Sequence, residues 1–289
     1  MDDKLTIEAR GLGIKYYKHK IFELLEDLYY FYEFIANSSC DTADGLMITG
    51  KFSVGYHIYS SIQGTLESIK ILIYAGRLND VFALSRKYDD AILTALYATI
   101  LIKQDESKII ETEEELNSIL THSHVRKWSN KGKQLYKICT IPKSEIKKMD
   151  KYMWKLLGLK TKDSSSCKGK EKSQRQKCND NVHYNSLSVF TNNDYETLQQ
   201  NNKGLTLLDQ LYDVLIQSFA IHFSYLYIMK PYIYGSNDYI NSLEDGIQPE
   251  EDSERWVASI VQDVFDKYIK TEYREAANYL IKMNLMELK

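Results

Sequence analysis

The chain has 289 residues, of which 44% are hydrophobic and 12% aromatic, and this content is sufficient for a packed interior and excludes a fully disordered protein. Its net charge of −3 hides an uneven distribution, because residues 122–177 contain seventeen Lys and Arg against four Asp and Glu and so carry +13, whereas the remainder carries −16. Only 3 Pro and 13 Gly interrupt the chain, which favours long helices over structures rich in turns.

The first three predicted elements are helices. Apolar residues recur at steps of three and four over residues 14–36, and a second helical run covers about residues 52–74. Gly76 is placed to end that helix, and Asn79 or Asp80 is placed to cap the next one, which extends to about residue 103. The second half of this helix, residues 91–102, is apolar on nearly all sides, so we expect it at the centre of the core.

The middle of the chain changes in character. We predict a helix over residues 111–130 and a short basic helix that Ser144 caps and that ends near Gly158. Residues 159–182 are rich in Lys, Ser and Gln and almost lack apolar side chains, so they are predicted to form a flexible, partly disordered basic insertion.

Helical patterns resume over residues 183–200 and 205–232. Residues 214–229 lack charge but are shorter than the roughly 20 apolar residues that a membrane span needs, so a buried core helix is favoured over membrane insertion. Pro249 and the acidic residues after it are typical of the first turn of a last helix, whose buried face we place at Trp256, Ile260, Val264, Tyr268, Ala276 and Leu280. The whole chain, residues 1–289, is therefore predicted to be a single all-α domain, a bundle of about seven or eight helices with a basic, partly disordered insertion.

The cysteines and histidines predict neither a metal site nor a cofactor. The chain starts without the apolar run of a secretory signal and its four Cys are widely spaced, so we expect reduced thiols and a soluble, cytoplasmic protein. Cys167, Cys178 and His183 lack the paired spacing of zinc ligands. His122 and His124 would diverge on a helix, which favours surface histidines over an acid–base pair.

Two groups of polar residues are candidates for a catalytic site. Arg86 and Asp90 lie one helical turn apart on a face that also carries apolar residues, so they are predicted to form a partly buried ion pair. Such a pair occurs both in functional sites and as a purely structural contact. Tyr184, Ser188 and Asn192 form a stripe at four-residue steps that would either line a cleft or face water.

The spacing of these two groups resembles that of a known protein family. An Arg-x-x-x-acid helix followed, after a variable insert, by a Tyr-x-x-Leu-Ser helix resembles a family of bacterial helical proteins of unknown function, over roughly residues 56–223. The resemblance implies a helical bundle in which Arg86, Asp90, Tyr184 and Ser188 converge, although this chain has Asn192 where the family tends to carry His. The bundle is also distantly similar to the HEPN ribonucleases of prokaryotic defence and toxin systems. None of the seven Arg is followed by His at the four- to six-residue spacing typical of those enzymes.

The basic segment predicts binding to a polyanion better than any motif predicts a reaction. Phosphate contacts need Lys and Arg, and nearby Trp and Tyr side chains such as Tyr152 can stack on exposed bases. The candidate nucleic-acid contacts are Arg126, Lys127, Lys131, Lys133, Lys147 and Lys148. The leading hypothesis is a bacterial-type component of a defence or toxin system that binds RNA or single-stranded nucleic acid. The alternatives for the whole protein are a HEPN-like ribonuclease and a homo-oligomeric structural protein. For the basic segment alone, the alternatives are that its short helix binds an anionic membrane surface or a partner, or that the segment is merely a solvated loop.

Overall fold

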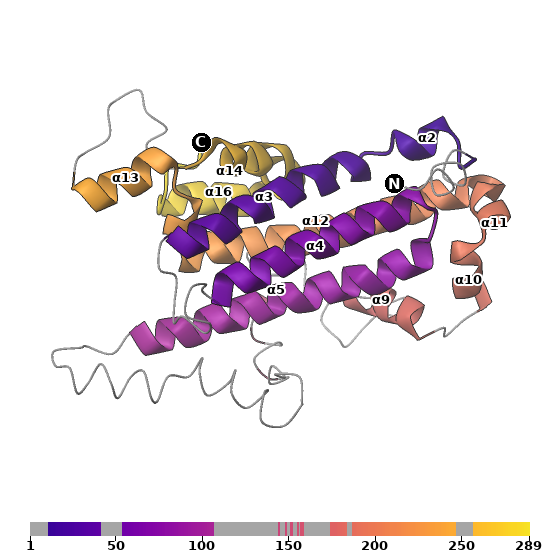
Figure 1. The fold of residues 1–289 in the computed structure, drawn as a ribbon, viewed down its shortest axis with the longest axis horizontal. Coiled ribbons are helices and arrows are strands. Elements are labelled where there is room, and N and C mark those ends of the chain that lie inside the picture. Colours follow the sequence, from indigo (N-terminus) through magenta and orange to yellow (C-terminus); the bar gives the residue numbers. More distant parts are fainter. Residues whose placement is uncertain are drawn as a thin grey trace. The chain divides into compact units, whose positions relative to one another are not determined.

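The computed structural model describes residues 11–41, 54–106, 174–183, 187–246 and 257–289, together with residues 144, 148, 151, 152, 155, 157 and 158. Every regular element in these residues is a helix and none is a strand, which confirms the predicted all-α class (Figure 1). None of the helices described in these ranges combines the length and the apolar character needed to cross a bilayer. The predicted helix over residues 111–130 lies outside the described residues.

The first predicted helix is divided into two. Helix α2 spans Ile14–Tyr17 and helix α3 spans Ile21–Asp41, with a break at residues 18–20. The His19 side chain stabilises the start of α3, because its Nδ1 accepts a hydrogen bond from the Ile21 amide at 3.2 Å. A ring nitrogen thus satisfies one of the amides that every helix start leaves without an internal partner.

Helix α4, Val54–Tyr74, ends as predicted, whereas helix α5, Leu78–Glu106, begins differently. Gly76 adopts a left-handed φ of 66°, and its amide donates to the Ile73 carbonyl at 2.9 Å. The prediction that Asn79 or Asp80 caps α5 is wrong, because both residues lie inside its first turn. The cap comes from far along the chain, where the Asn193 Oδ1 accepts a hydrogen bond from the Asn79 amide at 2.9 Å.

Short helices replace both the end of the predicted flexible insertion and the helix predicted after it. Helix α9, Gln174–Val182, forms within the predicted insertion and buries Cys178. The rest of the region contains the helices α10 (Leu187–Phe190), η1 (Thr191–Asn193), α11 (Tyr195–Gln199) and η2 (Gln200–Asn202). Asp194 interrupts the helix because its backbone is extended, and its carboxylate then caps α11 by accepting the Thr197 amide at 3.0 Å.

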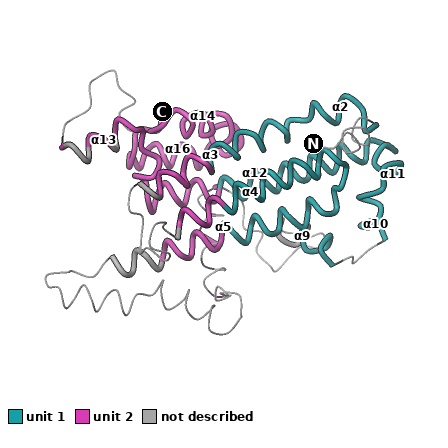
Figure 2. The backbone as a smooth tube through the Cα atoms, viewed as in Figure 1, with its two compact units in different colours: residues 1–32, 61–91, 162–220 teal, residues 33–60, 92–161, 221–289 magenta. Residues whose placement is uncertain are grey.

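Helix α12, Lys203–Met229, follows, and the chain divides into two compact units (Figure 2). Unit 1 comprises residues 1–32, 61–91 and 162–220, and unit 2 comprises residues 33–60, 92–161 and 221–289. In unit 1, α3 contacts α12 through the edge-to-face pair Phe31 and Phe219, whose ring centroids lie 5.2 Å apart. It contacts α5 through the hydroxyls of Tyr32 and Tyr88, which lie 3.0 Å apart in the buried core. This core fixes the helices that carry the candidate residues of unit 1.

Unit 2 contains the remaining parts of α3, α4, α5 and α12 and the C-terminal helices. These are η3 (Pro231–Tyr234), α13 (Asn237–Asp245), α14 (Ser259–Val264), the π-helical turn η4 (Phe265–Ile269), α15 (Lys270–Glu272) and α16 (Arg274–Met283). Phe223 packs between the rings of Tyr234 and Phe265, with centroids 5.0 and 5.7 Å away. The last predicted helix is broken at Tyr273. Val264, Tyr268, Ala276 and Leu280 are buried as predicted, whereas Ile260 is only half-buried. Pro249 and Trp256 lie outside the described residues.

Candidate functional site

The predicted ion pair of Arg86 and Asp90 is confirmed, and it belongs to a larger polar cluster. The Arg86 Nη1 lies 2.8 Å from the Asp90 Oδ1 and 3.0 Å from the Asp89 Oδ2. Its Nε donates a hydrogen bond to the Asn179 Oδ1 at 2.9 Å, which joins α5 to α9. The Arg86 side chain is only 20% exposed. The guanidinium therefore holds two carboxylates about one turn away on its own helix and one amide on a separate helix.

Asp89 is the more enclosed of the two carboxylates, and the sequence reasoning missed it. Its side chain is 25% exposed against 51% for Asp90, and the Ser218 hydroxyl on α12 lies 3.5 Å from its Oδ1. The spacing of three residues from Arg86 could have revealed Asp89, because residues three apart also share a helix face. The cluster thus joins three helices of unit 1, and charge pairing of this kind fits a structural clamp as well as a catalytic site.

The structure describes only part of the predicted polar stripe. Asn192 is 7% exposed and lies in η1, and its Nδ2 donates to the Asn181 Oδ1 on α9 at 3.1 Å. Ser188 lies in α10, while its side chain and all of Tyr184 are outside the described residues. The four-residue stripe assumed one continuous α-helix, but the backbone changes to a tighter 3₁₀ turn at residue 191. Arg86 and Asn192 both contact α9, through Asn179 and Asn181 respectively.

A second polar group surrounds Asn193 at the start of α5. Besides capping α5, Asn193 donates from its Nδ2 to the Asp80 Oδ2 at 3.1 Å and accepts at its carbonyl oxygen from Arg77 at 3.2 Å. Lys203 donates to the Thr191 hydroxyl at 2.7 Å, and partial burial lowers the pKa of Lys203 although Asp194 opposes this shift. No local spacing in the sequence could reveal the contacts of Asn193, because it lies more than a hundred residues from Arg77, Asn79 and Asp80.

The described part of the basic segment presents cations on one helix face. Lys148, Lys151, Tyr152 and Lys155 are helical and exposed, and their spacing of three and four residues places them on one side of the helix. Ser144, also exposed, continues this side one turn earlier. The candidates Arg126, Lys127, Lys131, Lys133 and Lys147 lie outside the described residues, as do His122 and His124.

This basic helix ends against α16 within unit 2. Leu157 is buried, and Gly158 has a φ of 67° at a position where an added Cβ would collide with the Glu275 carboxylate. One turn along α16, Tyr279 is 43% exposed, and Tyr152 is 48% exposed. Burial, and after it the charge and hydroxyl of Tyr279, raises the pKa of Tyr152, which places the hydroxyls of these two exposed side chains close together.

The described residues hold no group of three or more His, Cys, Asp or Glu placed to bind a metal ion. Neither a family model, nor a curated protein, nor a solved structure matches this chain. The resemblance to the bacterial helical family and to HEPN ribonucleases therefore stays a prediction.

Proposed function

We propose that this chain binds a single-stranded polyanion, RNA in the first instance, through the basic segment of residues 122–177. The observation that carries the proposal is the exposed face of Lys148, Lys151 and Lys155, which lies in a segment with a charge of +13. Lys side chains that follow a phosphate backbone release its condensed counterions, and this release drives binding. The remainder of the chain carries −16 and repels the same ligand, so the charge pattern directs it to this segment.

The exposed rings of Tyr152 and Tyr279 favour a single strand over a duplex. Both side chains are more than two-fifths exposed, which leaves ring surface for contact with a ligand. Stacking of an unpaired base on such a ring contributes about 1–3 kcal/mol and tolerates any base. Bases within a duplex are already stacked on each other and cannot use this surface.

A salt titration with single-stranded RNA tests this proposal through the variant Lys148→Gln/Lys151→Gln/Lys155→Gln. Each lysine–phosphate contact contributes about 0.7 to the slope of log K against log salt for a single strand, so the slope should become shallower by about 2. The matched control is Lys15→Gln/Lys18→Gln/Lys87→Gln, which makes the same change in net charge at exposed lysines of unit 1. The control should keep the wild-type slope.

Two results would count against RNA binding through this face. Wild-type protein that fails to bind RNA at low salt would remove the proposal altogether. An equal decrease of the salt slope in the two triple variants would show that only net charge matters.

In the same assay Tyr152→Ala should weaken single-strand binding about fivefold or more while duplex binding changes little, as expected for a stacking contact.

A ribonuclease is the second proposed function, and only the polar cluster around Arg86 supports it. RNA cleavage by the wild-type protein that is unchanged in folded Arg86→Ala and Ser188→Ala variants would refute this assignment. A role in a defence or toxin system, and assembly into a homo-oligomer, are further proposals. The first is tested by the neighbouring genes and the second by the mass of the protein in solution.

A further inference from the structure

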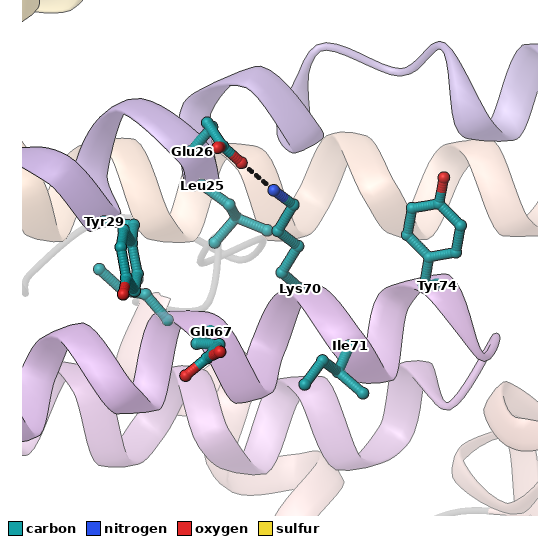
Figure 3. A pocket seen from close by; sticks show the side chains of 8 residues that line it. Leu25, Glu26, Tyr29, Glu67, Lys70, Ile71 and Tyr74 are labelled. Carbon is teal, nitrogen blue, oxygen red and sulfur yellow. Dashed lines mark hydrogen bonds and ion pairs between the residues drawn. The ribbon is translucent and has the colours of Figure 1, made fainter. Parts of the chain in front are cut away.

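A groove with a volume of about 590 Å³ lies between α3 and α4 in unit 1 (Figure 3). Its lining combines aliphatic, aromatic and charged side chains. The residues are Leu25, Glu26, Tyr29, Leu66, Glu67, Lys70, Ile71 and Tyr74. Sites for small organic ligands usually have volumes of about 300–1,000 Å³ and apolar walls with a few polar groups. The groove has both properties.

The charges of the lining favour a cation. The Lys70 ammonium reaches from α4 to the Glu26 carboxylate on α3 and forms an ion pair with it, so these two charges offset each other (Figure 3). Glu67 is exposed, and among the described residues it has no hydrogen-bond or ion-pair partner. The lining therefore keeps one negative charge that none of the described residues neutralises there.

The α3 side of the groove is also acidic beyond the lining itself. Apart from Glu26, which Lys70 offsets, residues 21–32 of α3 contain Glu23 and Asp27 and no Lys or Arg. An anion approaching this side would meet like charges, whereas a cation would be attracted. The acidic residues of α3 and the carboxylate of Glu67 thus both attract a cation.

The apolar part of the groove is unusually accessible. Ile71 is 38% and Tyr74 42% exposed, although most large apolar side chains described in α3 and α4 are buried. Tyr29 and Tyr74 lie at opposite ends of the lining (Figure 3). Exposed apolar surface in a concave site gains free energy when a ligand covers it, and the face of a tyrosine ring attracts a cation directly.

We propose that this groove binds an amphiphilic organic cation, a quaternary or protonated amine attached to an apolar or aromatic body. The cationic head lies at Glu67, and the apolar body covers Ile71 and one of the two tyrosine rings. This site is independent of the polyanion function, because none of its residues belongs to the basic segment. A carboxylate without a partner among the described residues, the exposed Tyr74 and the half-buried Tyr29 together are the chemistry that recognises such a cation.

Methyl NMR of the full chain tests this site, with benzyltrimethylammonium as the probe and Leu25, Leu66 and Ile71 as reporters. Benzylsulfonate has the same benzyl group and a tetrahedral head of opposite charge, and tetramethylammonium has the head without the ring. We expect benzyltrimethylammonium to shift the reporter methyls in a saturable way and to bind at least tenfold more tightly than either comparison compound. Equal or tighter binding of benzylsulfonate, or the absence of saturable shifts at the reporters, would overturn the proposal.

Two substitutions separate this site from binding by net charge alone. Glu67→Gln should weaken binding of benzyltrimethylammonium about fivefold, which is the effect of removing one unit charge at about 4 Å in a site open to water. Glu196→Gln, an exposed position on α11 outside the groove, makes the same change in net charge and should leave the affinity unchanged. Ile71→Lys places a cation at another exposed position of the lining and should abolish binding. Retained affinity in both groove variants, with circular dichroism showing that they are folded, would contradict the assignment.

Discussion

His222 makes unit 2 sensitive to acid. Its side chain on α12 is 0% exposed, and the ring of Tyr59 lies against it with a centroid distance of 5.8 Å. Burial lowers the pKa of His222 from 6.5 to about 3, because the charged imidazolium would lose its hydration in this core. The folded protein therefore keeps this ring neutral over the whole range in which an exposed histidine becomes charged.

The effect on stability follows from the two pKa values. Above pH 6.5 the ring is neutral in both states, so the difference in pKa costs nothing. As the pH falls from 6.5 towards 3, the unfolded chain binds a proton that the folded chain does not, and the free energy of unfolding decreases. At pH 5 the loss amounts to about 2 kcal/mol, and at pH 6 it is still below about 1 kcal/mol.

Urea unfolding of the wild type and His222→Gln, followed by circular dichroism at several pH values, measures this loss. Gln keeps a polar side chain of similar volume but does not titrate. Other groups titrate equally in both proteins, so the difference between their unfolding free energies isolates His222. The wild type should lose about 2 kcal/mol relative to the variant between pH 7 and pH 5. A difference that stays constant over this range would show that His222 is protonated as readily in the folded state as in the unfolded chain.

Further substitutions test contacts that stabilise each unit from within. Arg86→Ala should lower the free energy of unfolding by about 1–3 kcal/mol because the link from α5 to α9 is lost, whereas Lys87→Ala, at an exposed neighbour, should change it by less than about 0.5 kcal/mol. Asn193→Ala should cost about 1 kcal/mol through loss of the cap of α5, and hydrogen exchange at the first turn of α5 should accelerate; unchanged exchange there would contradict the capping role. Phe223→Ala should cost about 3–5 kcal/mol in urea unfolding, since the ring is fully buried between two others, and a loss below about 1 kcal/mol would be inconsistent with that packing.

The sequence was informative wherever structure depends on residues close together in the chain. Apolar spacing predicted α4, α5 and α12 because a helix repeats every 3.6 residues, and the pattern of its buried face is therefore local. Gly76 could be identified as a helix end for the same reason, since only its own backbone must adopt a positive φ. The ion pair of Arg86 and Asp90 was visible because one helical turn brings the two side chains together.

Periodicity did not reveal where a helix breaks. Residues 14–36 and 183–200 each keep a helical pattern, yet the backbone turns at residues 18–20 and again from residue 191 onward. The prediction failed there because the side chains of His19 and Asp194 accept hydrogen bonds from backbone amides at a new helix start, and such bonds compete with continuation of the helix.

By itself, then, the sequence determined the all-α class, most of the long helices and the concentration of positive charge in one segment. Only the tertiary structure decided that Asn193 caps α5, that Asn179 completes the cluster around Arg86, and that α3 and α4 enclose a groove beside Glu67. The physical reason is distance along the chain. These contacts join residues about 40 to 115 positions apart, and they form only once the packing of the helices has fixed which faces meet.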